Sequence, residues 1–188
     1  YANYSPNKVN KGQFLKFDFN VYSKLIEIFY PEISLGENTI MRGTINSNSD
    51  EFKFNFKSPS IKAYDNYLDN INIDIDNKNT LYNAYIEVDS IKTKRYKVSD
   101  FSLINVTAND TLFFRTEFKG GEKAADFYNL NLYHTINKEN NSVVGIKKSE
   151  VNFKDYLWFI NEDESKDNKI IFNKKLTDFS IVLIAMSH

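Results

Sequence analysis

Apolar and polar residues alternate along most of this 188-residue chain, and this alternation limits its fold more than any other feature. The stretches 17–21, 52–56, 71–75 and 84–88 each place an apolar residue at every second position. A period of two sends successive side chains to opposite faces of an extended chain, whereas a helix needs a period near 3.6. These four stretches therefore predict strands with one buried face and one solvated face.

Further segments rich in apolar and aromatic residues also predict strands, although several carry apolar residues on both faces. They are 101–108, 112–118, 127–136, 143–147, 151–160, 170–172 and 179–186. The segments between strands contain Asn, Asp and Gly, which tolerate the backbone angles of tight turns. Because short turns join antiparallel neighbours, the sequence predicts an all-β fold of mainly antiparallel strands.

One segment predicts a short helix instead. Within 22–30, Leu25, Ile26 and Phe29 recur at the spacing of a single helix face, and Pro31 ends the run. We expect this helix to precede the main array of strands.

Part of the sequence repeats at a spacing of about 30 residues. The tripeptide Ser-Ile-Lys at 60–62 recurs at 90–92, and the pattern at 68–73 recurs at 98–103 and again at 176–181. Chance similarity among strands rich in Asn, Asp and Ser is the alternative explanation. Because structural repeats stack in one direction, we expect one elongated, repeat-built trough over 1–188. The apolar run at the end of the last strand suggests that this unit is a piece of a longer chain.

The composition excludes several classes of protein. The 24 Lys and Arg residues balance 25 Asp and Glu residues, so no basic field is present to gather a nucleic acid. No stretch approaches the roughly 20 apolar residues of a transmembrane helix. The absence of cysteine excludes disulfides, thiol catalysis and thiolate metal sites.

No motif in the chain carries catalytic or metal-binding chemistry. His134 has no second histidine near it in sequence, and a calcium loop beginning at Asp74 lacks its glycine and has Tyr85 in place of the bidentate glutamate. The acidic residues within 162–167 are typical of a solvated loop. We therefore expect a protein that is not an enzyme and that holds no cofactor or metal.

The candidate functional feature is the apolar face of the predicted sheet. Alternation leaves two structures open, a closed sandwich with two such faces packed together or an open groove, and the repeat favours the groove. The residues expected to line the groove are Phe52, Phe54, Phe56, Ile71, Ile73, Ile75, Ala84, Ile86, Val88, Leu112, Phe114 and Phe118.

The second half of the chain resembles a known family. The segments NDTLFFRTEFKGG at 109–121, FYNLNLYHTI at 127–136 and SVVGIKKS at 142–149 are similar to the translocation and assembly module component TamB of Bacteroidota, a member of the AsmA-like superfamily. The resemblance is strongest over 80–188, and the segment 22–42 also looks like the part of the family that precedes a new block of strands.

The resemblance implies a location, a shape and a partner. TamB-like proteins are anchored in the inner membrane by an N-terminal helix and cross the periplasm as a long β-taco, of which this chain would be an interior piece. They partner an outer-membrane barrel of the TamA or BamA type. Two roles attach to the family, conduction of phospholipid to the outer membrane and assembly or secretion of outer-membrane and autotransporter proteins.

Three hypotheses for function follow. In the first, the apolar groove binds lipid acyl chains during outer-membrane biogenesis. The alternative is a scaffold for assembling barrel proteins, in which the strand after residue 179 pairs with a client strand. The third is a closed β-sandwich that binds carbohydrate through Tyr82, Tyr85, Tyr128 and Trp158.

Overall fold

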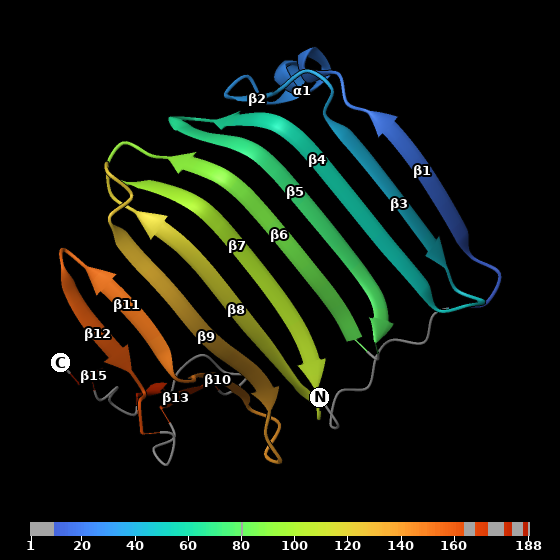
Figure 1. Cartoon of the computed structure of the whole chain (residues 1–188). Helices are drawn as coiled ribbons and strands as arrows, with labels where there is room; N and C mark the ends of the chain where they lie inside the picture. The colour runs from blue at the N-terminus through green and yellow to red at the C-terminus, as the bar shows by residue number, and fades with distance from the viewer. Residues whose placement is uncertain (1–9, 80, 164–167, 173–178, 182–185, 188) are drawn as a thin grey trace.

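A computed structural model describes residues 10–79, 81–163, 168–172, 179–181 and 186–187. These residues form one 15-stranded sheet and one short helix (Figure 1). The prediction of an all-β fold of mainly antiparallel strands with one short helix is confirmed.

Eight strands lie side by side along the main part of the sheet, and each pairs antiparallel with the next. In spatial order they are β1 (Phe14–Asn20), β3 (Ile40–Asn46), β4 (Glu51–Ala63), β5 (Asn66–Asn79), β6 (Leu81–Lys92), β7 (Lys97–Ala108), β8 (Thr111–Gly120) and β9 (Asp126–Ile136). The four clearest predicted strands lie in β1, β4, β5 and β6, although Val21 falls just beyond the end of β1. The short strand β2 (Ile33–Leu35) pairs with the end of β4.

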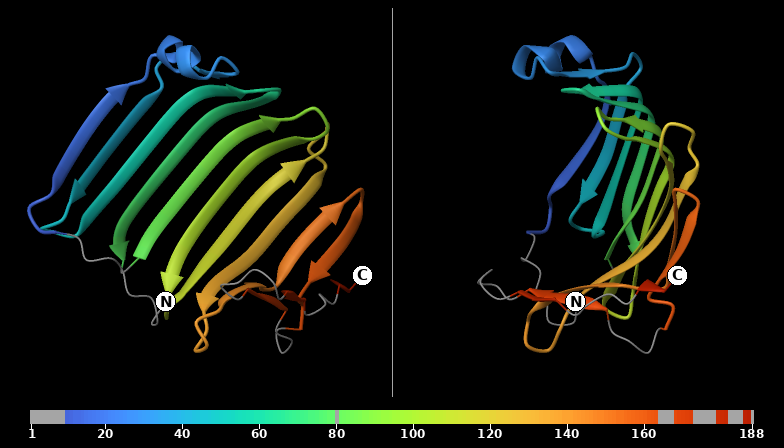
Figure 2. Two further views of the ribbon diagram at one scale, coloured as in Figure 1. Left: turned by 180° about the vertical axis from the view of Figure 1, so that it is seen from behind. Right: turned by 90° about the vertical axis from the view of Figure 1, so that its left-hand side faces the viewer.

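The sheet is a single curved layer. Every pair of strands in substantial contact within the described residues is a pair of hydrogen-bonded neighbours, and the one helix contacts only β2 to a comparable extent. No second sheet packs on either face of this part of the chain. Figure 2 shows the layer from the side, bowed so that it has a concave and a convex face. The open trough is therefore correct, and the closed sandwich is not the structure formed.

A crease crosses β4 to β7 at the same level in each strand. In β5 the φ angle of Asn70 is 48°, and in β7 the φ angle of Asp100 is 52°. Asn and Asp adopt this left-handed conformation at less cost than most residues. The ladder between β4 and β5 goes from Ser58 opposite Ile71 to Ser60 opposite Asp69, leaving out Pro59 and Asn70.

The crease reverses the alternation of faces along each strand. On one side of it, the N–H of Phe52 points toward β5 and donates to Asn77 Oδ1 at 2.8 Å. On the other side, the C=O of Ser60 points toward β2 and accepts from the N–H of Gly36 at 2.7 Å. Positions eight apart in an unbroken strand would direct these groups to the same neighbour. Apolar residues three apart across the crease, such as Leu68 and Ile71, can therefore share a face.

The crease explains the sequence repeat. The patterns at 68–73 and 98–103 place Asn70 and Asp100 at the same position, so the repeat encodes one bend in alternate strands. The third copy, at 176–181, lies partly outside the described residues.

Beyond β9 the sheet divides into two arms. One half of β9 pairs with β10 (Ser142–Ile146), which leads to β13 (Lys169–Phe172) and β14 (Phe179–Ile181). The other half pairs with β11 (Ser149–Phe153), which leads to β12 (Tyr156–Ile160) and β15 (Met186–Ser187).

The prediction of one strand at 151–160 was wrong. Lys154 and Asp155 adopt φ angles of 51° and 64° and turn the chain between β11 and β12. The predicted strand at 179–186 is described only at its two ends, and 182–185 lie outside the described residues.

The helix α1 (Ser23–Phe29) forms where the sequence predicted it, but its apolar face is not buried. Leu25 is 58% and Phe29 is 76% exposed, and no residue of α1 is buried. In sequence the helix does not precede the whole array, because it follows β1, which pairs with β3. Figure 1 shows it beyond the ends of the strands. Within the described part of the chain, no helix has the length and hydrophobicity needed to cross a bilayer.

Candidate functional site

The strand register brings the predicted lining residues into rows that cross the sheet. Facing residues in an antiparallel pair project to the same side, so each row runs at right angles to the strands. One row contains Phe56, Ile73 and Ile86, a second contains Phe54, Ile75 and Ala84, and a third contains Ile71 and Val88. Residues from three strands therefore share one apolar surface, which we call the floor.

The floor lies on the concave face. Ile71 and Val88 are each only 5% exposed, although no second layer covers them. In a single sheet, a side chain can be buried this far only by neighbours on its own face, which lean together where that face is concave. The flanking Phe54, Phe56 and Ile73 are half-buried, so much of their apolar surface stays open.

The three predicted residues of β8 continue the floor. Phe114 faces Leu132 of β9, and Leu112 faces His134. The ring of Phe118 stacks on Tyr128 with the ring centroids 4.4 Å apart. The floor thus extends across β8 and β9.

Sequence reasoning missed several residues of the floor because only the register reveals them. They continue the rows on both sides of the predicted set and are Phe19, Met41, Leu103, Phe101, Leu130 and Leu132. In β1 the ring of Phe17 covers Gly43 so closely that a Cβ at that position would lie 2.4 Å from a ring carbon. Alternation marks such residues as apolar, but it does not say which residue of another strand they face.

Polar residues interrupt the rows. Asn105 and Thr116 make their hydrogen bonds within the protein, whereas the buried Oγ1 of Thr107, which faces Leu112, has no partner among the described residues. The buried side chain of Asn105, between Ala84 and Phe114, accepts from the N–H of Ala84 through Oδ1. Thr116 donates from Oγ1 to the C=O of Ser102 at 2.9 Å. Because a satisfied polar group costs far less to cover than an unsatisfied one, Asn105 and Thr116 leave the floor able to accept an apolar molecule.

His134 is the one titratable group in this region that sequence analysis singled out. Its Nε2 lies 2.6 Å from Ser142 Oγ. Burial lowers the pKa of the imidazole below its ordinary value of 6.5, because desolvation disfavours the charged form. The neutral ring at neutral pH adds no charge to the apolar face.

The convex face is largely polar over β1 and β3 to β6, whereas β7 and β8 expose Ile104, Val106 and Phe113 on it. Arg42 Nε lies 3.0 Å from both carboxylate oxygens of Asp18, and Asn55 Nδ2 donates to Asp74 Oδ1 at 2.6 Å. A shallow hollow of about 800 Å³ crosses β1 and β3 to β7, walled by two neighbouring rows of these outward side chains. Phe54, Ile75 and Ala84 contribute to its base, so this hollow lies behind the floor and is separate from it.

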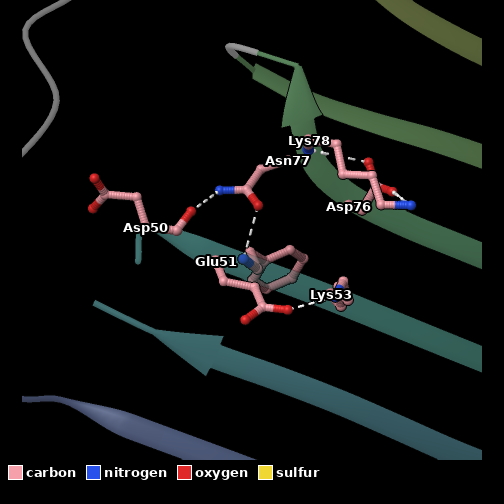
Figure 3. A network of polar contacts seen from close by, with 7 residues as sticks. Asp50, Glu51, Lys53, Asp76, Asn77 and Lys78 are labelled. Atoms are coloured by element: carbon pink, nitrogen blue, oxygen red, sulfur yellow. Dashed lines mark hydrogen bonds and ion pairs between the residues drawn. The ribbon is translucent and has the colours of Figure 1, made fainter. Parts of the chain in front are cut away.

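Polar contacts also close the rim of the sheet between β4 and β5 (Figure 3). Asn77 accepts from the N–H of Phe52 and donates to the C=O of Asp50, while Lys53 pairs with Glu51. Asn83 donates to Asp76, and this hydrogen bond holds the pKa of that carboxyl below its usual value. Glu51, Lys53 and Asp76 alternate with the floor residues, so these charges lie on the convex face at this end of the sheet.

Of the aromatic residues proposed for carbohydrate binding, Tyr85 lies on the face opposite to Tyr128 and Trp158. Tyr85 lies on the convex face, where its hydroxyl donates to Glu87, whereas Tyr128 stacks on Phe118 on the concave face. Trp158 belongs to the row of Tyr128 and Val151, and the side chain of Tyr82 lies outside the described residues. The register therefore separates Tyr85 from Tyr128 and Trp158, which share one row.

The described residues contain no group of three or more His, Asp or Glu side chains placed to hold a metal ion. Comparison with known proteins identifies no family model, no curated protein and no solved structure that matches this chain.

Proposed function

We propose that this chain is a non-enzymatic segment that holds lipid acyl chains on its concave floor and conducts them across the sheet, as part of phospholipid transport to the outer membrane. The observation that carries the proposal is the combination of apolar rows across β4, β5 and β6 with the lack of any covering layer in the described residues. The resemblance to TamB adds the periplasmic setting and the outer-membrane barrel as an indirect partner.

The energetics favour an apolar guest. Each CH₂ group removed from water contributes about 0.8 kcal/mol, so an acyl chain gains several kcal/mol by lying along the floor. From β1 to β9 the sheet has eight strands, and a spacing of about 4.8 Å gives roughly 34 Å of floor. The head group can remain in solvent, because the trough is open along its length.

The floor predicts weak discrimination between acyl chains. Its residues are aliphatic and aromatic, and the hydrogen bonds of Asn105 and Thr116 are already made within the sheet. A surface with few free polar groups has few contacts that depend on chain length or unsaturation. The alternative role in assembling barrel proteins rests on the strand after residue 179, most of which lies outside the described residues.

The direct test is uptake of a fluorescent fatty acid by the delipidated protein. Phe56→Asp places a charge in the floor and should reduce uptake at least roughly tenfold. Lys57→Asp, one residue along β4 on the exposed convex face, is the matched control and should leave uptake unchanged. Equal uptake by the two variants, with both folded by far-ultraviolet circular dichroism, would contradict the proposal.

A second readout needs no substitution. Trp158 is the single tryptophan, and it shares a row with Val151, Tyr128 and Phe118. A fatty acid brominated on its chain should quench the fluorescence of Trp158, and an unbrominated acid should not. Absence of quenching at concentrations where uptake is complete would place the bound chain away from the part of the floor on β8 and β9.

A further inference from the structure

One edge of the sheet is open and apolar. The edge strand β1 pairs with β3 on one side and with no described strand on the other, and Figure 1 shows it at the margin of the array. Leu15 and Phe19 are 52% and 51% exposed. Natural sheets usually protect such an edge, because its free N–H and C=O groups are a template for another strand.

The backbone of β1 is oriented to accept a further strand. The C=O of Gln13 accepts from Ser47, and the N–H of Val21 donates to Thr39, so both residues direct polar groups toward β3. By the alternation of an antiparallel ladder, the other odd-numbered positions of β1 also point toward β3. The even-numbered positions, Lys16 and Asp18 among them, therefore present their N–H and C=O groups to the free edge.

We propose that the occupant of this edge is β1 of a second copy of the chain, paired antiparallel about a two-fold axis at Phe17. The sequence FLKFDFN is self-complementary in that register. Lys16 of each copy faces Asp18 of the other, and Leu15 faces Phe19. Each facing pair of even-numbered residues can exchange two backbone hydrogen bonds, and opposite charges directly across a ladder stabilise it.

The charges of the present structure fit this pairing. Asp18 already holds Arg42 of its own chain, and Lys16 makes no ion pair within the described residues. In the dimer Asp18 lies between Arg42 and Lys16 of the second copy, so each acid has a cation on either side. The side chains of Asp18 and Arg42 are 61% and 54% exposed, which leaves them accessible to a second copy.

The dimer joins two floors. A two-fold axis perpendicular to the sheet keeps both copies the same way up, so their apolar faces lie on one side. The row that contains Phe17, Gly43 and Phe54 then runs from one copy into the next through the two Phe17 rings. This pairing does not depend on lipid binding, so it can be tested on the delipidated protein.

Charge reversal gives a sharp test by analytical ultracentrifugation. Lys16→Asp places two acids opposite each other and Asp18→Lys places two cations opposite each other, so each variant alone should raise the dimer dissociation constant about tenfold or more. A mixture of the two variants restores opposite charges at both facing positions and should dimerise as the unaltered chain does. Lys57→Asp is the control for net charge and should dimerise normally.

A backbone variant keeps the test independent of charge. Lys16→Pro removes an N–H that faces the free edge and leaves the hydrogen bonds between β1 and β3 in place, so it should give a folded monomer. A monomeric unaltered chain at high micromolar concentration would overturn the proposal. So would dimers that tolerate both single reversals, or a mixture that fails to restore association.

Discussion

The two faces of strands β4 to β8 differ in the side chains that alternation sends to them. On the convex face, polar side chains hydrogen-bond one another, as Asn55 does with Asp74. On the concave face, apolar rows are partly buried by curvature alone, and Ile71 and Val88 are the most enclosed. The difference teaches that a single-layer sheet can hold an apolar surface open to a guest if its other face supplies solubility.

The largest expected difference between the faces is the cost of shortening a side chain. Ile71→Ala removes a buried side chain from the floor and should lower the free energy of unfolding by about 2–4 kcal/mol. Ile104→Ala on the convex face removes a side chain that is 43% exposed and should cost less than about 1 kcal/mol. Urea denaturation measures both, and equal losses would show that the faces are not distinct.

The crease changes which residues of a strand reach each face, and the backbone angle of Asn70 at the crease can be tested separately. Asn70→Ala puts a residue with a Cβ but no local hydrogen bond at a φ of 48°, and should cost about 1–2 kcal/mol. Asn70→Gly should cost less, because glycine adopts this angle freely. Asn70 Nδ2 also donates to Asp89 Oδ2 at 2.7 Å, so Asp89→Ala measures the contribution of that bond alone. If alanine and glycine are equivalent, the left-handed angle is not what the asparagine provides.

An exposed ion pair on the convex face should contribute little. Arg42→Ala breaks the pair with Asp18, whose side chains are both more than half exposed, and should cost about 0–1 kcal/mol at low salt. The effect should shrink as ionic strength rises, because salt screens exposed charges. Thermal unfolding at two salt concentrations tests this, and a large loss that does not depend on salt would mean that Arg42 stabilises the strand by packing.

The smallest expected effect is the titration of His134. Because its pKa is lowered in the folded protein, the unfolded chain binds the proton more readily, and protonation favours unfolding. Stability should therefore decrease as the pH falls through about 6.5 toward the lower pKa of the folded state. His134→Gln should remove that increment, which the difference between the two pH profiles of unfolding measures. Identical profiles would contradict it.

The period of two was enough to predict β1, β4, β5 and β6, whereas β3, which also belongs to the central array, was not predicted from the sequence. Phe56 and Ile73 illustrate why, because each lies in a regular alternation that one buried face requires. The repeat at 68–73 and 98–103 was also visible, although its meaning was not. Asn is common in turns, so the sequence alone does not show that Asn70 lies in the middle of a strand. The pairing of β4 with β5 on both sides of Asn70 shows that the strand continues past it.

Other features depend on contacts that no local pattern encodes. The turn at Lys154 and Asp155 was missed because Lys-Asp is not a typical turn dipeptide. Apolar residues also flank the pair on both sides. Leu25 and Phe29 predicted an apolar helix face, and both side chains are exposed in the structure. Such a face is buried only if the fold brings another surface against it. The pairing of β9 with two different strands likewise depends on long-range register.

The position of the crease also sets the cross-section of the trough. In β5 four residues precede Asn70 and nine follow it, so at about 3.3 Å per residue the segment before the crease is roughly 13 Å long. The segment after it, which carries Ile71, Ile73 and Ile75 of the floor, is roughly 30 Å long. In cross-section the trough therefore has one short side and one long side. Adding residues to the strands on the short side would lengthen that side alone, so the depth of the channel can change while its width is kept.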